Sequence, residues 1–338
     1  MIKVENVTKK YGKFTAVNDI SFEIKDNEVV GFLGVNGAGK TTTMNMITGC
    51  IEPTLGTIKI DEIDISRKPK KAKKEIGYMP EGVPLYSNST VREFITFMAE
   101  LRGIKGKEKK KQVDKVIEET GLKEVEKSLT RNISRGYKQR VSLAGALVGS
   151  PKVLILDEPT VGLDPQQVKQ IRELIKSLKR NHTVLLSSHI LSEVSQMCER
   201  VVIIDKGEIV AVDTPENLEN KVNKKNIINI TIEDKNNKIY EVVKKIEYIQ
   251  KIELIKENKD GTKQYSIFAE KGKDIRKEIS EKLIQNDITI YEMKKAEATL
   301  EDAFLGLIND YKKETEKSKE NKEKTKTEKN NKKEGGEE

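Results

Sequence analysis

A glycine-rich segment, GVNGAGKTT at residues 34–42, has the residue types and spacing of a loop that binds phosphate groups. Its glycines allow the backbone to curl so that successive N–H groups point at phosphate oxygens. The side chain of Lys40 suits the β- and γ-phosphates of a nucleotide, and the hydroxyl of Thr41 suits Mg²⁺. The residues that we predict to bind phosphate are Gly34, Asn36, Gly37, Ala38, Gly39, Lys40, Thr41 and Thr42.

The segments on either side of this loop are those that a phosphate-binding loop requires. Glu28 to Leu33 is predicted to be a short buried strand, and Thr41 to Thr48 is predicted to be a helix that ends at Gly49. The first turn of such a helix adds free N–H groups and a partial positive charge. A glycine-rich turn that binds nothing is the alternative, and the order of strand, loop and helix argues against it.

Two adjacent carboxylates, Asp157 and Glu158, follow the apolar run Val153 to Leu156. Such a run is typical of a central parallel strand, and ligands bind at the carboxyl edge of an open α/β sheet. We predict that Asp157 coordinates Mg²⁺ beside Thr41, and that Glu158 accepts a proton from the water that attacks the γ-phosphate. An ordinary Asp-Glu pair that caps a strand is the alternative, and the phosphate loop upstream disfavours it.

Two further polar positions carry weaker signals when each is taken alone. Ser134 and Gly136 stand at the predicted start of a helix, where they form either a second anion site or a simple helix cap. His189 follows the predicted strand Thr183 to Ser187, and a lone histidine at a strand end is more often structural than catalytic.

The elements that position these residues are predicted from hydrophobic periodicity and capping signals. Thr90 and Glu93 form a capping box that opens a helix ending at Gly103, and a helical insert is predicted over about residues 84–150. Asp164 and Pro165 open the helix after the carboxylates. The other elements predicted here are strands at 2–8, 19–24 and 57–60, a helix ending at Gly121, a helix at 136–148, and a hairpin of 201–205 with 208–212. The insert therefore divides an α/β core into two halves.

Length and composition favour roughly two domains and exclude several classes of partner. The net charge of +8 over 338 residues is small against 63 basic and 55 acidic side chains, which indicates solvated surface rather than a nucleic-acid-binding stripe. Cys50 and Cys198 are expected to be reduced, as in a cytosolic protein. No apolar run approaches the roughly 18 residues that span a bilayer, and the N-terminus has no signal-peptide core, so membrane contact is expected only through a partner.

A change in composition near Asn220 to Lys225 predicts a linker. The predicted domains are therefore 1–220, a small α+β domain at 226–310 and a charged tail at 311–338. The elements predicted in the small domain are strands at 227–232, 264–268 and 288–291 and a helix at 274–285. Lys312 to Glu338 contains no aliphatic or aromatic residue, so the tail is predicted to be disordered.

Taken in order, the phosphate loop, the helical insert and three later motifs resemble the ATP-binding subunit of ABC transporters. The later motifs are ISRGYKQR at 133–140, VLILDEPTVGLDP at 153–165 and SSH at 187–189. The resemblance covers about residues 1–215 and is greatest to exporters with a separate membrane chain, namely those of sodium export, gliding motility and antibiotic resistance. KAEATLEDAFLGLI at 295–308 also resembles the accessory domain of that group.

The fold class implied by the resemblance is α/β. It comprises a P-loop NTPase core of the ABC ATPase type, with an antiparallel β subdomain and the helical insert. A small C-terminal α+β domain and a disordered tail complete the expected architecture. The predicted ATP-binding domain corresponds to residues 1–220.

The same resemblance assigns roles at further positions. Tyr11 would stack on adenine and Val17 would pack near the ribose, although Tyr11 is equally typical of an aromatic residue in a hairpin. Ser134 and Gly136 would contact the γ-phosphate that is held by the opposite subunit of a head-to-tail dimer. Asp164 would communicate across that interface.

His189, by resemblance, would clamp the γ-phosphate and orient Glu158. Two positions depart from the commonest family pattern. ISRGY stands at 133–137 where most members have LSGGQ, and the serine and second glycine survive, so the anion contact is expected to survive as well. Glu81 stands where many members carry a metal-contacting glutamine; a carboxylate there would bind Mg²⁺ more strongly but would crowd the phosphate oxygens. Glu81 therefore joins the predicted metal ligands.

The function implied by the resemblance is the ATP-hydrolysing subunit of an ABC-type exporter, with ATP and Mg²⁺ as cofactors. The expected partners are a second copy of the chain and an integral-membrane permease, and no nucleic acid. The expected location is peripheral, at the cytoplasmic face of the cell membrane, with membrane contact only through the permease. The alternative is a soluble ABC-family ATPase that acts in regulation, on ribosomes or in DNA repair. A single ATPase unit, a short insert and an intact carboxylate pair argue against these alternatives.

Overall fold

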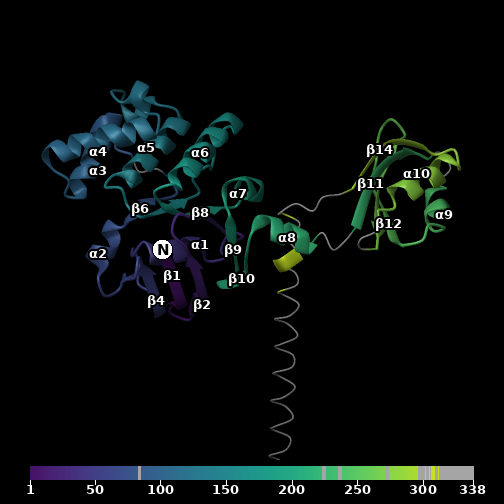
Figure 1. Ribbon diagram of the computed structural model, residues 1–338, viewed down its shortest axis with the longest axis horizontal. Helices are drawn as coiled ribbons and strands as arrows, with labels where there is room; N and C mark the ends of the chain where they lie inside the picture. Colours follow the sequence, from purple (N-terminus) through teal and green to yellow (C-terminus); the bar gives the residue numbers. More distant parts are fainter. Residues whose placement is uncertain are drawn as a thin grey trace, which may run out of the picture. The chain divides into compact units, whose positions relative to one another are not determined.

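The computed structural model describes residues 1–82, 85–222, 226–234, 238–270, 274–295, 301, 304, 306–308 and 311. These residues form two compact units (Figure 1). One unit comprises Met1–Pro215 with the described residues that follow Gly306, and the other comprises Glu216–Gly306. Helix α8 (Pro215–Val222) extends into the segment that we predicted to be a linker, Asn220 to Lys225, of which residues 223–225 lie outside the described residues.

A six-stranded sheet of order β10-β9-β3-β8-β7-β6 forms the centre of the first unit. Its neighbouring strands pair in parallel, except for the antiparallel hairpin of β9 and β10. The strands are β3 (Val29–Leu33), β6 (Ile76–Met79), β7 (Val153–Asp157), β8 (Thr183–Ser188), β9 (Arg200–Asp205) and β10 (Glu208–Asp213). Because β3, β7 and β8 are buried along their whole length, the sheet is covered on both faces. The carboxyl ends of these strands meet at one edge, where the predicted site residues follow.

A four-stranded antiparallel sheet of order β2-β1-β4-β5 shares a hydrophobic core with the central sheet. Its strands are β1 (Ile2–Tyr11), β2 (Phe14–Ile24), β4 (Leu55–Ile60) and β5 (Ile63–Asp64). Helix α1 (Lys40–Ile47) contributes buried side chains to the same core. This sheet confirms the antiparallel β subdomain. Strand β2 begins earlier than the predicted Asp19, because Tyr11 pairs with Phe14 across a tight turn at Gly12, whose φ of +58° suits glycine.

The helical insert contains α3 (Val91–Leu101), α4 (Gly106–Glu119) and α5 (Arg135–Leu147), with 3₁₀ turns η1 (Lys123–Val125) and η2 (Thr130–Asn132) between the last two. The capping box of Thr90 and Glu93 is confirmed at the start of α3. Helix α6 (Pro165–Leu178) follows the carboxylates as predicted. Some short elements were not predicted from the sequence, namely α2 (Pro69–Lys74), β6 and α7 (Leu191–Met197). Among the described residues, no helix has the length and apolar character that crossing a membrane requires.

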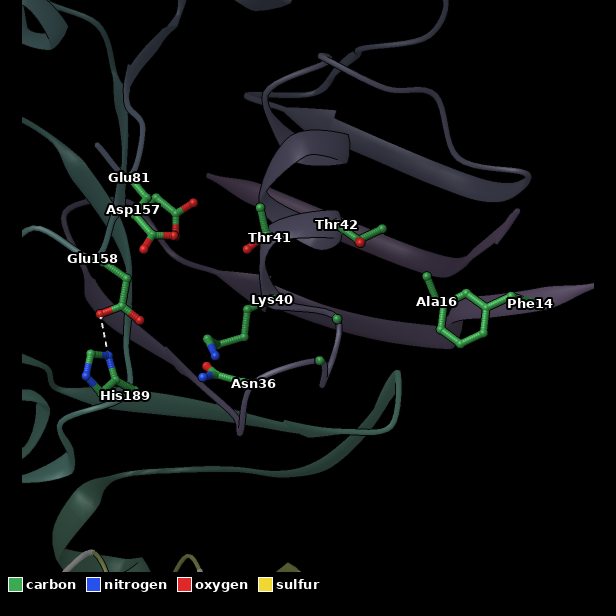
Figure 2. A pocket seen from close by; sticks show the side chains of 12 residues that line it. Phe14, Ala16, Asn36, Lys40, Thr41, Thr42, Glu81, Asp157, Glu158 and His189 are labelled. Atoms are coloured by element: carbon green, nitrogen blue, oxygen red, sulfur yellow. Dashed lines mark hydrogen bonds and ion pairs between the residues drawn. The ribbon is translucent and has the colours of Figure 1, made fainter. Parts of the chain in front are cut away.

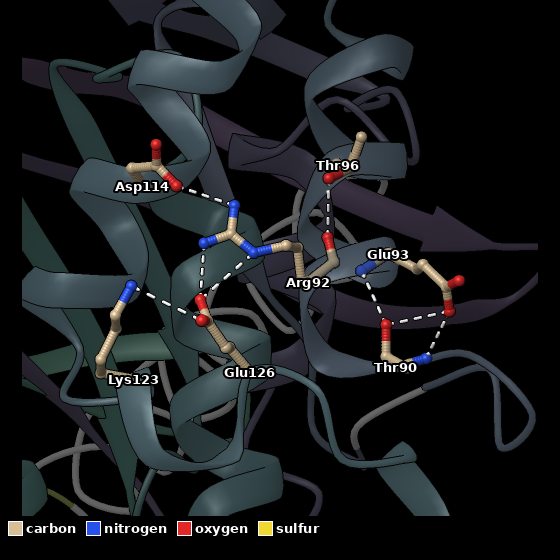
Figure 3. A network of polar contacts seen from close by, with 7 residues as sticks. All are labelled: Thr90, Arg92, Glu93, Thr96, Asp114, Lys123 and Glu126. Carbon is tan, nitrogen blue, oxygen red and sulfur yellow. Dashed lines mark hydrogen bonds and ion pairs between the residues drawn. The ribbon is translucent and has the colours of Figure 1, made fainter.

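An ion-pair network joins the helices of the insert (Figure 3). The guanidinium of Arg92 on α3 lies 2.7 Å from Asp114 of α4 and 2.5 Å from Glu126, which follows η1. Lys123 makes a longer contact of 3.5 Å with Glu126. Hydrogen bonding from Arg92 holds the pKa of Glu126 below its usual value. The network therefore ties the segment that leads to α5 onto the first two helices of the insert.

We expect Arg92→Ala to lower the midpoint of thermal unfolding, and the difference from wild type to be largest near neutral pH. A carboxyl whose pKa is lower in the folded than in the unfolded chain stabilises the fold above its unfolded pKa, and this contribution is lost as the pH falls through the folded pKa. The difference should therefore shrink below about pH 4. Lys123→Ala removes only the longer contact and should shift the midpoint less. A difference that stays constant into the acid range would contradict this assignment.

The second unit is a four-stranded antiparallel sheet with two helices on one face. Its elements are β11 (Asn226–Glu233), α9 (Ile239–Val243), β12 (Ile249–Glu257), β13 (Lys263–Ala269), α10 (Arg276–Ile284) and β14 (Thr289–Lys295). The chain order βαββαβ and the sheet order β12-β13-β11-β14 are those of a ferredoxin-like fold. Buried residues of both helices and of the covered sheet face form one hydrophobic cluster. The α+β class agrees with the prediction, which missed α9 and β12.

Several sequence predictions concern positions that are not described. The proposed disorder of the tail at 311–338 concerns residues that, except for 311, lie outside the described residues. Most of the segment at 295–308, which resembles an accessory domain, lies outside them too. The predicted first residue of the helical insert, Pro84, is also outside them, and the described part of the insert begins at Leu85.

Candidate functional site

A cavity of about 400 Å³ opens at the carboxyl edge of the central sheet (Figure 2). It brings together the phosphate loop after β3, the segment after β6, the carboxylates at the end of β7 and the histidine after β8. Its lining residues are Phe14, Ala16, Asn36, Gly37, Gly39, Lys40, Thr41, Thr42, Glu81, Asp157, Glu158 and His189. Residues from distant parts of the sequence therefore meet at one site.

The phosphate loop has a backbone that only glycine accommodates at two of its positions. Gly39 has φ +108°, and a Cβ there would lie 2.9 Å from the carbonyl oxygen of Ala16. A Cβ on Gly34 would lie 2.5 Å from the carbonyl oxygen of Ile204. Gly39 is also the N-cap of α1 and provides no side-chain cap, so the first N–H groups of the helix remain available to an anion.

Lys40 carries a positive charge at the mouth of this loop. Its side chain is nearly buried, and Nζ donates hydrogen bonds to the carbonyl oxygens of Gly34 at 2.8 Å and Val35 at 3.3 Å. No carboxylate pairs with Lys40 in the part of the chain that the structure describes. The ammonium group of Lys40 is therefore available to an anionic ligand and is not part of a structural ion pair.

The two carboxylates at the end of β7 are both buried, with exposures of 3% for Asp157 and 8% for Glu158. Glu158 has φ +51°, a left-handed conformation that costs roughly 1–2 kcal/mol for an L residue. Strained backbone of this kind is found at functional sites, where the surrounding structure holds it in place. The turn at Glu158 directs its carboxylate into the cavity (Figure 2).

His189 lies on the rim of the cavity, with about half of its side chain exposed. Its Nδ1 lies 2.9 Å from Glu158 Oε2, which is hydrogen-bond distance (Figure 2). The tautomer with a proton on Nδ1 donates this bond and leaves Nε2 free to interact with a ligand. The histidine that was ambiguous from its sequence position is therefore in contact with the predicted catalytic base.

Thr41, Glu81 and Asp157 line the cavity together, as the metal prediction requires. The described residues include no group of three or more His, Cys, Asp and Glu side chains that could hold a metal ion by themselves. This donor set fits Mg²⁺, which binds through one or two carboxylates together with substrate phosphates and water. The charge of Asp157 also reaches Tyr78 on β6: burial chiefly, and then this charge, raise the pKa of Tyr78 to about 12.

The residues predicted to contact the nucleotide of a second subunit lie elsewhere on the chain. Ser134 caps α5, because its Oγ accepts a hydrogen bond from Tyr137 N–H at 3.4 Å, and Asp164 caps α6 by accepting one from Gln167 N–H at 2.8 Å. A second cavity of about 330 Å³ is lined by Ser134, Gly136, Tyr137, Arg140, Asp164, Gln166, Gln167, Gln170 and Ile171. The two cavities share no lining residue. Within one chain, these residues are therefore not brought to the phosphate loop.

The unusual Arg135 packs against the loop that follows the carboxylates. A Cβ on Gly162 would lie 2.3–2.5 Å from three guanidinium atoms of Arg135, and Gly162 has φ +69°. The arginine thus fills the space that the absence of a side chain at Gly162 provides. The loop from Glu158 to Asp164 therefore touches the start of α5 directly.

Tyr11 and Val17, the predicted adenosine contacts, do not line the cavity. Tyr11 is half-exposed at the end of β1, with Lys9 Nζ 5.2 Å from its ring centre, and Val17 is buried in the core. Phe14 and Ala16 of β2 line the cavity instead, and sequence reasoning missed both. Phe14 is 66% exposed and reaches the cavity through the pairing of β1 with β2, which no local sequence signal shows. Gly34 and Ala38 lie within the loop but do not line the cavity.

Comparison with known families and proteins gives concordant matches. A family model described as ABC transporter matches residues 17–161. The bacitracin transport ATP-binding protein BcrA of Bacillus licheniformis is 37% identical over 311 residues, which are 91% of this chain and 97% of that protein. The linearmycin resistance ATP-binding protein LnrL of Bacillus subtilis (strain 168) is 37% identical over 253 residues, which are 75% of this chain and 81% of that protein.

Solved structures match the fold of about two thirds of the chain. The structure of cbiO1 from Clostridium perfringens, described as part of the ABC transporter complex cbiONQ, has a TM-score of 0.60 and 31% identity, and the match covers 66% of this chain and 94% of that one. A structure of MJ0796, described as a dimeric bacterial ABC transporter cassette, has a TM-score of 0.58 and 27% identity, with 63% of this chain and 98% of that one covered.

Proposed function

Since the chain belongs to the family of ABC transporter ATP-binding subunits, we propose that two copies of it bind two ATP molecules between them, head to tail, and so drive an exporter. ATP binding and hydrolysis are the activity of this family, and the chain is similar to ATP-binding proteins of linearmycin resistance and bacitracin transport. We propose four things beyond this activity: that the chain forms a dimer, that it binds Mg²⁺, that it docks on a membrane partner, and that it lies at the membrane.

The observation that supports the proposed dimer is that the two cavities are separate. The phosphate loop and the carboxylates line one cavity, whereas Ser134 and Gly136 line the other, with no residue in common. A helix N-terminus capped by a serine is suited to a phosphate group, and in one chain it has no nucleotide to contact. A head-to-tail pair supplies that contact twice, and MJ0796 is described as dimeric.

The chemistry proposed for each half of the dimer follows from the geometry of the cavity. Lys40 and the N-terminus of α1 bind the β- and γ-phosphates of ATP. Glu158 accepts the proton of the attacking water, and His189 Nδ1 donates to Glu158 and so orients it. Thr41, Glu81 and Asp157 would hold Mg²⁺. The metal ion would neutralise charge on the phosphate oxygens.

The proposed contact with a permease lies on the helical insert. Tyr86 and Phe97 pack edge to face with ring centres 5.5 Å apart, yet they are 59% and 38% exposed. Leu101 on the same helix as Phe97 is 66% exposed. Exposed apolar and aromatic side chains gathered in this way are typical of a protein–protein contact. Docking of the permease there would place the chain at the cytoplasmic face of the membrane without membrane contact of its own.

The test is co-purification from detergent-solubilised membranes of the native host, with the full chain carrying an affinity tag. We expect a protein with several membrane spans to be enriched with the wild type and lost with Phe97→Asp. Leu254→Asp, at a position 42% exposed on the second unit, is the matched control and should retain the partner. Enrichment of no such protein, or equal enrichment by the Phe97 variant, would contradict the proposed docking surface.

A further inference from the structure

Ser187 is a buried serine near the carboxyl end of β8, two residues before His189. In the parallel register of the sheet it stands opposite Asp157 of β7. Its exposure is 0%, so its hydroxyl must find its hydrogen-bond partners within the protein. None of the roles assigned to the phosphate-binding site uses this residue.

The hydroxyl of Ser187 bonds to both neighbouring carboxylate residues. The backbone N–H of Glu158 donates to Ser187 Oγ at 2.9 Å, and Ser187 Oγ donates to Asp157 Oδ1 at 2.5 Å. An amide N–H can only donate, so the single hydroxyl proton is left for the carboxylate. One serine therefore fixes an oxygen of Asp157 and the backbone of Glu158 at the same time.

These two bonds bear on the proposed roles of the carboxylates. Ser187 donates to Oδ1 of Asp157, and no other hydrogen bond to this carboxylate occurs among the described residues, so Oδ2 is the oxygen with both lone pairs open to a metal ion. Glu158 is held by its amide at the residue where φ is +51° and the chain turns sharply. That turn directs its carboxylate toward His189 and the cavity (Figure 2).

We propose that Ser187 is a positioning residue for ATP hydrolysis, which holds the metal-binding oxygen of Asp157 and the catalytic base Glu158 in one fixed arrangement. The inference rests on the proposed function, because it requires Asp157 to bind Mg²⁺ and Glu158 to accept the proton. Loss of the hydroxyl frees the Asp157 carboxylate to rotate and leaves the amide of Glu158 unpaired. Both metal binding and the chemical step should then weaken, whereas binding of the nucleotide alone should not.

Ser188, the residue next to Ser187 in the sequence, provides a matched control. Its exposure is also 0%, but its Oγ accepts a hydrogen bond from Ile190 N–H at 3.0 Å. It therefore shapes the turn that carries His189, and among the described residues it makes no hydrogen bond with the side chain of Asp157 or Glu158. A hydroxyl lost from this position should leave the metal dependence of nucleotide binding unchanged.

The experiment is equilibrium binding of a non-hydrolysable ATP analogue to the full chain, in Mg²⁺ and in EDTA. The ratio of the two affinities measures how much the metal ion strengthens binding. Ser187→Ala should lower this ratio about tenfold, as expected for a lost hydrogen bond to a charged group, and should leave the affinity in EDTA unchanged. Ser188→Ala should keep the wild-type ratio, and Ser187→Thr, which retains the hydroxyl, should recover most of it. In steady-state hydrolysis, Ser187→Ala should lower kcat more than it raises KM.

An unchanged ratio in Ser187→Ala, with kcat within about twofold of wild type, would overturn the inference. An equal loss of affinity in Mg²⁺ and in EDTA would also overturn it, because a purely structural role affects both. Asp157→Asn separates this failure from that of the proposed function. If Asp157→Asn lowers the ratio of the affinities in Mg²⁺ and in EDTA while Ser187→Ala keeps the wild-type ratio, only the role of Ser187 is wrong. If neither variant changes it, the metal assignment itself is wrong.

Discussion

Replacing Glu158 by glutamine is expected to lower the rate of ATP hydrolysis by about 100-fold or more, within the range observed for general bases. Glutamine has nearly the shape of glutamate but cannot accept the proton of the attacking water. Glu158 is only 8% exposed, and its carboxylate is directed into the cavity where the attacking water must lie. The affinity for ATP should be retained, because Lys40 and the phosphate loop are unchanged.

The measurement is steady-state phosphate release by the purified full chain, with ATP affinity determined separately. Glu173→Gln is the matched control, since Glu173 lies on α6 with its side chain 61% exposed, and it should hydrolyse ATP at the wild-type rate. Hydrolysis by Glu158→Gln at the normal rate would show that another group accepts the proton. A variant that fails to bind ATP would show instead that Glu158 serves the fold of the site.

Ser134→Asp is expected to bind ATP as well as the wild type and yet to hydrolyse it about 100-fold more slowly. Aspartate caps a helix as well as serine does, so α5 should keep its first turn. The added charge, however, opposes the γ-phosphate presented by the other chain, and repulsion at contact distance costs several kcal/mol in a site from which water is excluded. ATP affinity of the separate chain should not change, because Ser134 lies outside the phosphate-loop cavity.

Two further variants serve as comparisons for Ser134→Asp. Lys40→Ala should lose ATP binding itself, since the cation belongs to the cavity that holds the phosphates. Ser134→Asn keeps a neutral cap and should be impaired less than the aspartate variant. If Ser134→Asp weakened ATP binding as severely as Lys40→Ala, both residues would serve one nucleotide within a single chain. The head-to-tail arrangement would then be wrong.

The phosphate loop and the carboxylates were predictable because their chemistry fixes their order along the chain. A glycine-rich turn must lie between a strand and a helix, and a metal-binding carboxylate must follow a buried strand. Long periodic elements such as α3 and α6 were predictable for a similar reason, since a whole apolar face repeats in the sequence. The prediction of the site therefore rests on motifs, and the prediction of the core rests on periodicity.

What the sequence did not reveal depends on tertiary packing. Strand β12 carries Ile249, Ile252 and a series of charged residues, and its pairing with β13 decides its structure. Phe14 reaches the cavity only because β1 and β2 pair as one hairpin beside the phosphate loop. The role inferred for Ser187 requires the register that sets it opposite Asp157. None of these relations is encoded by local spacing.

The central claim is that ATP joins two copies of this chain, and the most direct test is the molar mass of Glu158→Gln in solution. Light scattering on the purified full chain should give 38.3 kDa without nucleotide and twice that mass with ATP and Mg²⁺. The double variant with Ser134→Asp should remain at the single-chain mass under both conditions. A Glu158→Gln chain that binds ATP with Mg²⁺ and still shows 38.3 kDa would contradict the account.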